Sequence, residues 1–173
     1  MSASLSRRAV SICAAVALAG CWAMDVSAQS EDTPAKRAQP KVQAKPKVAA
    51  TATHKVAIQV SENDKAAMNL ALNNAKNVID YYKGKGETVA IEIVTYGPGL
   101  HMLRADTSPV KERIAPMALE NPNLKFIACG NTQANQSKAE GKPVTLISEA
   151  KVMPSGVVRL MELQKQGYAY IKP

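Results

Sequence analysis

Short apolar segments alternate with amphipathic ones through the last two thirds of the chain, and this alternation restricts its fold more than any other feature. The pattern predicts strands over residues 55–60, 88–95, 124–129 and 168–171, with one more short strand within 144–153. Helices are expected between them, over 64–82, from 108, from 130 and over 156–166. Short connections of this kind require parallel strands with helices on both faces. We therefore predict one α/β domain over residues 54–173, with three layers (α/β/α) and a mainly parallel sheet of about five strands.

Three features of these helices carry further expectations. The first helix has a polar stripe at fourfold spacing beside its apolar face, formed by Asn69, Asn73 and Asn77. A solvated flank explains this stripe more simply than a subunit contact does. Ser108 and Pro109 suit the N-cap and the first turn of the second helix. Pro116 removes a helical hydrogen bond, so a kink or an early end is expected there.

The N-terminal part of the chain does not have the composition of a folded domain. Arg7 and Arg8 precede an apolar run that is too short to span a bilayer, which is the layout of a secretory signal over residues 1–28. Two cleavage points fit this layout: the small residues before Gln29, and a lipobox-like sequence ending at Cys21, which would be lipidated. We expect a periplasmic protein, either soluble or held to a membrane through Cys21.

Residues 29–53 are rich in Ala, Lys, Pro and Gln and have almost no large apolar side chains, so a disordered linker is predicted. This linker is either a tether or a plain solvated leader. Of the formal net charge of +8, the signal carries +1 and the linker +3, which leaves a mild excess of +4 on the domain. The domain has no basic stripe interleaved with aromatic residues, so we expect no nucleic-acid partner.

The cysteines point to one residue. Cys13 leaves with the signal, and Cys21 leaves or is capped by lipid, so the domain keeps only Cys129. A lone thiol in an oxidising compartment cannot form an internal disulfide. It is therefore a buried structural residue, a partner in an intermolecular bond or a reactive group, and the sequence leaves these alternatives open.

The predicted topology places Cys129 at an informative position. In open parallel sheets, ligands bind at the carboxyl ends of the strands. Cys129 ends the third strand and precedes a helix, whose N-terminus favours a thiolate. His101 follows the neighbouring strand and would assist if it reached the thiol; a loop histidine that faces water is the simpler alternative. The candidate binding residues of this edge are Tyr96, Gly97, Gly99, Gly130, Asn131, Thr132 and Ser155.

No cofactor or metal site is expected. The segment Tyr96-Gly-Pro-Gly99 is too short for a phosphate loop. Its glycines either let a backbone approach the site closely or form a simple turn, and the turn is the simpler explanation. One cysteine and one loop histidine do not make a metal site without further ligands.

Several segments together resemble the DsrE/DsrF-like family with its YchN-like fold, and specifically an exported branch of it. They are Val56-Ala-Ile-Gln-Val60, Ile91-Glu-Ile-Val-Thr-Tyr-Gly-Pro-Gly-Leu100, Phe126-Ile-Ala-Cys-Gly-Asn-Thr132, Pro154-Ser-Gly-Val-Val158 and Gly167-Tyr-Ala-Tyr-Ile171. The resemblance implies a three-layer fold and assembly as trimers or hexamers. It also implies that Cys129 matches the cysteine that carries persulfide sulfur in relay members. The segment after Cys129 is not a relay signature.

Two functions remain from the sequence. The first is an envelope sulfur-handling protein, a candidate sulfurtransferase or sulfur carrier, with Cys129 accepting sulfane sulfur from an unknown donor for an unknown acceptor. The alternative is a non-catalytic oligomeric binding module in which Cys129 is structural.

Overall fold

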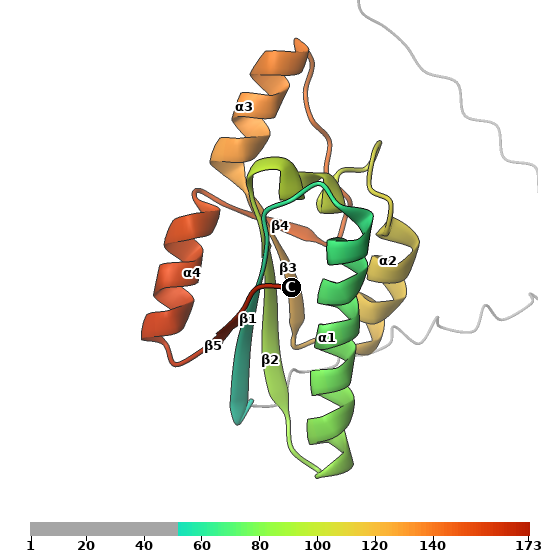
Figure 1. Cartoon of the computed structure of the whole chain (residues 1–173), viewed down its shortest axis with the longest axis vertical. Helices are drawn as coiled ribbons and strands as arrows, with labels where there is room; N and C mark the ends of the chain where they lie inside the picture. The colour runs from blue at the N-terminus through green and yellow to red at the C-terminus, as the bar shows by residue number, and fades with distance from the viewer. Residues whose placement is uncertain (1–51) are drawn as a thin grey trace, which may run out of the picture. The chain divides into compact units, whose positions relative to one another are not determined.

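A computed structural model describes residues 52–173, so the signal and nearly all of the linker assignment lie outside the described part. Five strands form one sheet in the order β4-β3-β2-β1-β5, and every pairing is parallel (Figure 1). The strands are β1 His54–Val60, β2 Val89–Thr95, β3 Leu124–Cys129, β4 Ala150–Met153 and β5 Ala169–Ile171. This confirms the predicted α/β class with a parallel sheet.

Helices cover both faces of this sheet. They are α1 Lys65–Gly84, the 3-10 helix η1 Gly97–Leu103, α2 Lys111–Glu120, α3 Gly130–Glu140 and α4 Gly156–Lys165. The larger core lies between one face of the sheet and α1, α2 and η1, as its members Ile58, Met68, Leu100 and Ile114 show. α4 covers the other face (Figure 1).

α4 packs on the sheet through a small apolar core and one ion pair. Only Leu160 and Leu163 of α4 join its small core. Beside them, Glu92 of β2 is 2% exposed. Its carboxylate accepts two hydrogen bonds from the Arg159 guanidinium, at 2.8 Å from Nε and 2.6 Å from Nη2. A buried carboxylate needs such a partner, so this ion pair holds α4 on the sheet.

The second helix differs from its sequence expectation at both ends. α2 begins at Lys111 with Val110 at its N-cap, not at Ser108. The Ser108 hydroxyl instead donates to the Met102 carbonyl at 2.5 Å, which keeps it with η1. Nor does the helix end early at Pro116, because it continues to Glu120. Pro116 lies on the exposed side of α2, where water can satisfy the carbonyl that it leaves without a donor.

The asparagine stripe of α1 contacts α2 of the same chain. The Arg113 guanidinium donates to the side-chain oxygens of Asn69 and Asn73. Part of the stripe therefore forms polar contacts between α1 and α2 of one chain. This differs from both sequence interpretations, the solvated flank and the subunit contact.

Candidate functional site

The carboxyl edge of the sheet brings three predicted segments into contact around Cys129. β3 ends at Cys129, and α3 starts at the next residue. Gly156, the first residue of α4, packs directly against this point: a Cβ built on it would lie 3.1 Å from the Tyr96 Cβ and 3.2 Å from the Cys129 Cβ. The first turn of α4 can approach the thiol this closely because residue 156 has no side chain.

The surroundings of the Cys129 sulfur favour its thiolate form. Burial raises the pKa of this thiol, since the residue is 5% exposed. The Thr132 hydroxyl and the backbone N–H groups of Gly156, Thr132 and Asn131 act in the opposite direction, and the net pKa lies below its ordinary value. These are polar contacts from the N-termini of two helices, and Cys129 makes no regular capping hydrogen bond to α3. The Asn131 N–H also donates to the Pro154 carbonyl at 3.1 Å.

α3 is attached to the loop after β2 through both polar groups of Gly97. The Gly97 N–H donates to the Thr132 hydroxyl oxygen at 3.0 Å, and the Gln136 side-chain amide donates to the Gly97 carbonyl at 3.2 Å. Gly97 has φ +55°, a conformation that glycine adopts at little cost. An open hollow of about 450 Å³ lies beside this contact, lined by Gly97, Pro98, His101, Thr132, Asn135, Gln136 and Ala139.

His101 lies in this hollow but is directed elsewhere. Its Nδ1 atom lies 2.8 Å from the Thr107 hydroxyl. Among the interactions of residues 52–173, none joins His101 to Cys129, and Thr132 is the residue that both lines the hollow and contacts the sulfur. His101 therefore does not meet the condition set for assisting the thiol, which was direct reach of Cys129.

The remaining candidates have mainly structural positions. Gly99 is buried against the backbone of Val60, so its segment opens η1 in place of a simple turn and packs closely on the end of β1. The Ser155 hydroxyl caps α4 by accepting from the Val158 N–H at 3.4 Å. Gly130 starts α3 next to β4, where a Cβ would lie 3.2 Å from the Val152 side chain.

Comparison with known proteins agrees with this architecture. The family model described as DsrE/DsrF-like family matches residues 54–173. The chain belongs to the DsrE/DsrF-like family. Among solved structures, it is similar to MTH1491 from Methanobacterium thermoautotrophicum, a protein of unknown function, with 29% identity and a TM-score of 0.59 over 69% of this chain and 99% of that one. Among curated proteins, none matches the chain.

In this DsrE/DsrF-like domain, two residues of the site around Cys129 were not among those expected from the sequence: Gly156 and Gln136. Gly156 was missed, although its neighbour Ser155 was chosen as a binding residue of this edge. Gln136 was missed because nothing in a polar helix marks one amide as bound to Gly97. The glycine directly after the N-cap Ser155 is a weak local signal that the first turn of α4 packs closely against another element.

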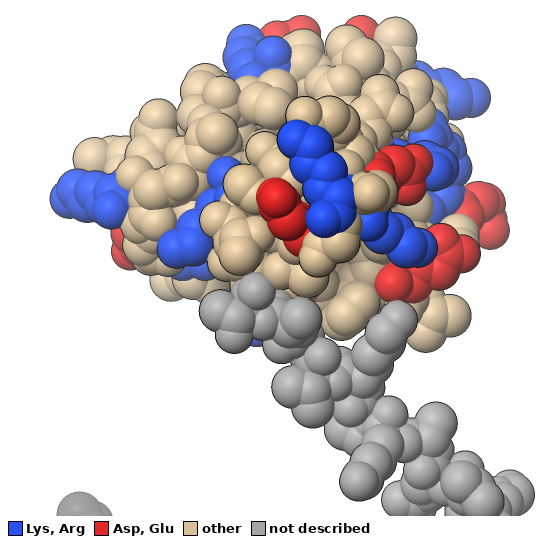
Figure 2. Space-filling model, turned by 90° about the horizontal axis from the view of Figure 1, so that it is seen from below, with Lys and Arg blue, Asp and Glu red and all other residues tan. Residues whose placement is uncertain are grey.

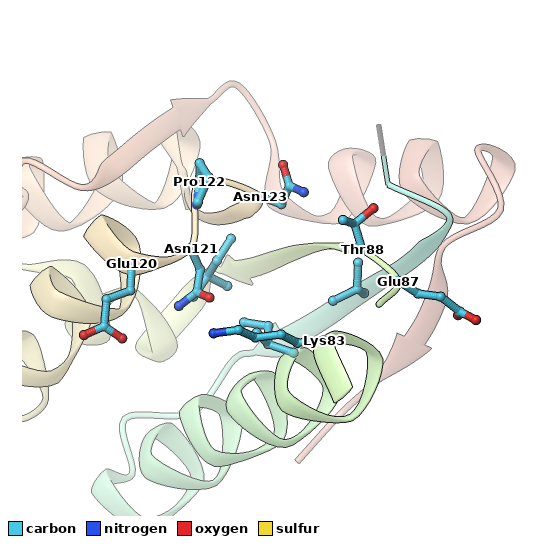
Figure 3. A pocket seen from close by; sticks show the side chains of 10 residues that line it. Lys83, Glu87, Thr88, Glu120, Asn121, Pro122 and Asn123 are labelled. Atoms are coloured by element: carbon cyan, nitrogen blue, oxygen red, sulfur yellow. The ribbon is translucent and has the colours of Figure 1, made fainter. Parts of the chain in front are cut away.

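A second hollow of the domain lies at the opposite, amino edge of the sheet. It has a volume of about 180 Å³ and is formed by the end of α1, the start of β2 and the turn between α2 and β3. Figure 3 shows Lys83 extending into it, toward Asn121. None of the predicted site residues lies there, so this hollow is separate from the thiol.

Within the described part of this family member, neither surface charge nor grouped metal ligands mark a further site. On the face shown in Figure 2, basic and acidic side chains are interspersed with uncharged surface. Within residues 52–173 there is no group of three or more His, Cys, Asp or Glu side chains suited to a metal ion. Over the same residues, no helix is both long and apolar enough to cross a membrane.

Proposed function

We propose that this chain carries sulfane sulfur on Cys129 as a persulfide. The observation that supports this function most directly is the position of the thiol, which ends β3 between the N-termini of α3 and α4. A thiolate is the reactive form in sulfur chemistry, and this position favours it. Membership of the DsrE/DsrF-like family, which is generally linked to sulfur relay, points in the same direction.

The proposed step is a simple exchange with a persulfide donor, R–S–SH. The Cys129 thiolate attacks the outer sulfur of the donor, and the donor's S–S bond breaks as the new one forms. R–S⁻ leaves with the electron pair, and the proton stays on the transferred sulfur. The product is Cys129–S–SH, and the exchange needs no external oxidant or reductant. Backbone N–H groups near the sulfur can stabilise the anionic persulfide as they do the thiolate.

Intact-mass spectrometry after incubation with a small persulfide or polysulfide tests this step. The wild-type protein should gain one or more sulfur atoms that a reducing agent removes, whereas Cys129→Ser should gain none. If the wild-type protein gains no sulfur while its thiol still reacts with an alkylating agent, the sulfur-carrier function is wrong.

Two observations favour a second function, a non-catalytic oligomeric binding module. Cys129 is nearly inaccessible in the folded chain, as a structural cysteine would be. On α4, Val157, Val158 and Met161 are each about half exposed and offer an apolar surface for association. A thiol that resists alkylation until the protein is unfolded would favour this non-catalytic binding module.

Export and assembly complete the proposal. We infer a periplasmic location from residues 1–28, with an N-terminus at Gln29 or a lipidated Cys21 in the protein from its host. We also propose a trimer or hexamer. An intact residue 1 or 2 on the folded cytosolic protein would contradict export, and a monomer in light scattering at micromolar concentration would contradict assembly.

A further inference from the structure

α3 is a helix that the core does not hold. None of its eleven residues, all of them within the described part of the chain, is buried. Figure 1 shows it projecting beyond the sheet. An isolated helix of this length is marginal in water. Its stability therefore depends on the polar contacts that attach it to the rest of the domain.

Those contacts fall at three places along α3. In its first two turns, Thr132 and Gln136 bind the two polar groups of Gly97. In its middle, the Gln133 amide donates to the Val144 carbonyl at 2.9 Å, and the Val144 N–H donates to the Ser137 hydroxyl oxygen at 2.9 Å. At its last residue, the Glu140 carboxylate receives two hydrogen bonds from the Arg104 guanidinium, with Nη2 2.9 Å from Oε2. Charge-assisted paired hydrogen bonds of this kind are stronger than neutral ones. The pair with Arg104 is therefore the strongest single attachment of α3.

Arg104 is a fixed anchor on the domain side. Its side chain is 2% exposed and also pairs with the Asp106 carboxylate. Its backbone forms a bridge with Leu146. By contrast, the Glu140 side chain is 32% exposed, so water can take over its charge when α3 detaches. Breaking this pair therefore contributes to the free energy of detaching α3, and it does not require the rest of the domain to unfold.

The thiol lies where α3 begins. With 5% exposure, Cys129 offers a donor very little surface in the closed structure. Two of the three N–H groups near its sulfur, and the Thr132 hydroxyl, belong to the first turn of α3. Local unfolding of this helix removes that side of the enclosure, while the sheet and α4 stay in place.

We propose that α3 is a gate over Cys129, which opens by local unfolding and which the Arg104–Glu140 pair keeps closed. This deepens the proposed function, because it explains how a buried thiol meets its sulfur donor. Small polar helices with few apolar contacts are the parts of a protein that open most often. The gate regulates the site: whatever competes for Glu140 or Arg104 increases access to the thiol.

The test compares Glu140→Gln with Glu120→Gln in the otherwise unchanged protein. Glu120 is also exposed and also the last residue of its helix, α2, so its substitution removes the same unfavourable charge at a helix C-terminus. Two rates are measured in each variant: alkylation of Cys129 by iodoacetamide and hydrogen exchange of the α3 amides. In Glu140→Gln both rates should rise by the same factor, about fivefold, while Glu120→Gln should match the wild-type protein.

Each alternative outcome is informative. Equal rates in both variants would refute the gate. Faster exchange in α3 without faster alkylation would also refute it, because α3 would then not be the cover of the thiol. A common rise in both rates, in a protein that accepts no sulfur from a persulfide, would support the gate and refute the sulfur-carrier function.

Discussion

Gly99→Ala is the substitution for which the structure predicts the clearest effect on stability. A Cβ at this position would lie 2.2 Å from the Val60 carbonyl oxygen and 2.6 Å from the Val60 carbonyl carbon. Ordinary contacts between non-bonded carbon atoms are about 3.5–4.0 Å. Both clashing atoms belong to the backbone at the end of β1, so no side-chain rotation relieves the contact. η1 must therefore move away from the sheet by roughly 1 Å.

The cost follows from what η1 carries into the core. Leu100, Met102 and Leu103 are all completely buried. Overpacking alone costs about 1–3 kcal/mol, and full burial of one such side chain contributes about 1.5–3 kcal/mol. Partial loss of this packing brings the expected destabilisation to roughly 3–5 kcal/mol. A small domain has about 5–15 kcal/mol in total, so the variant should fold but with little reserve.

Urea unfolding followed by circular dichroism measures this difference. Gly84→Ala is the matched control, because Gly84 is the last residue of α1 and a Cβ there would meet nothing within 4 Å. Alanine should leave this helix end unchanged or stabilise it by up to about 1 kcal/mol. A Gly99→Ala variant within about 1 kcal/mol of the wild-type protein would refute the steric argument.

Three further predictions concern α4 and the thiol. Arg159→Met leaves the Glu92 carboxylate buried without its partner and should lower the free energy of unfolding in urea by roughly 3 kcal/mol. The double variant Arg159→Met/Glu92→Met should recover most of this loss, and additive effects of the two changes would contradict the ion-pair argument. The pKa of Cys129 is lowered in the folded protein, so ionisation of the thiol stabilises the fold. The stability of the wild-type protein relative to Cys129→Ser should therefore rise with pH from the folded pKa to the unfolded value of about 8.5 and stay constant above it. This extra stability should be lost as pH falls through the folded pKa, and a difference that does not change with pH would contradict the lowered pKa. Thr132→Val should raise the pKa of Cys129, as measured by ultraviolet absorbance of the thiolate against Cys129→Ser, while Thr132→Ser and the exposed control Thr145→Val should not.

Local sequence pattern was sufficient for most of the fold. The third strand has the bounds that its apolar run predicts, and the helix after it begins at Gly130 as expected, so the position of Cys129 at the carboxyl edge followed from the sequence. Errors arose where a distant contact outweighed a local preference. Ser108 is a good N-cap by type, but the Met102 carbonyl holds its hydroxyl, and α2 starts later.

The sequence by itself determined how strands and helices follow one another along the chain, because apolar spacing and turn residues act over a few neighbouring positions. It also determined that the domain has one thiol and which edge of the sheet holds it. Tertiary structure alone decided what surrounds that thiol: Gly156 approaches it, Thr132 contacts it, and His101 pairs with Thr107 instead. These contacts join segments far apart in the chain, and only the packing of α3 and α4 against the sheet brings their atoms within range.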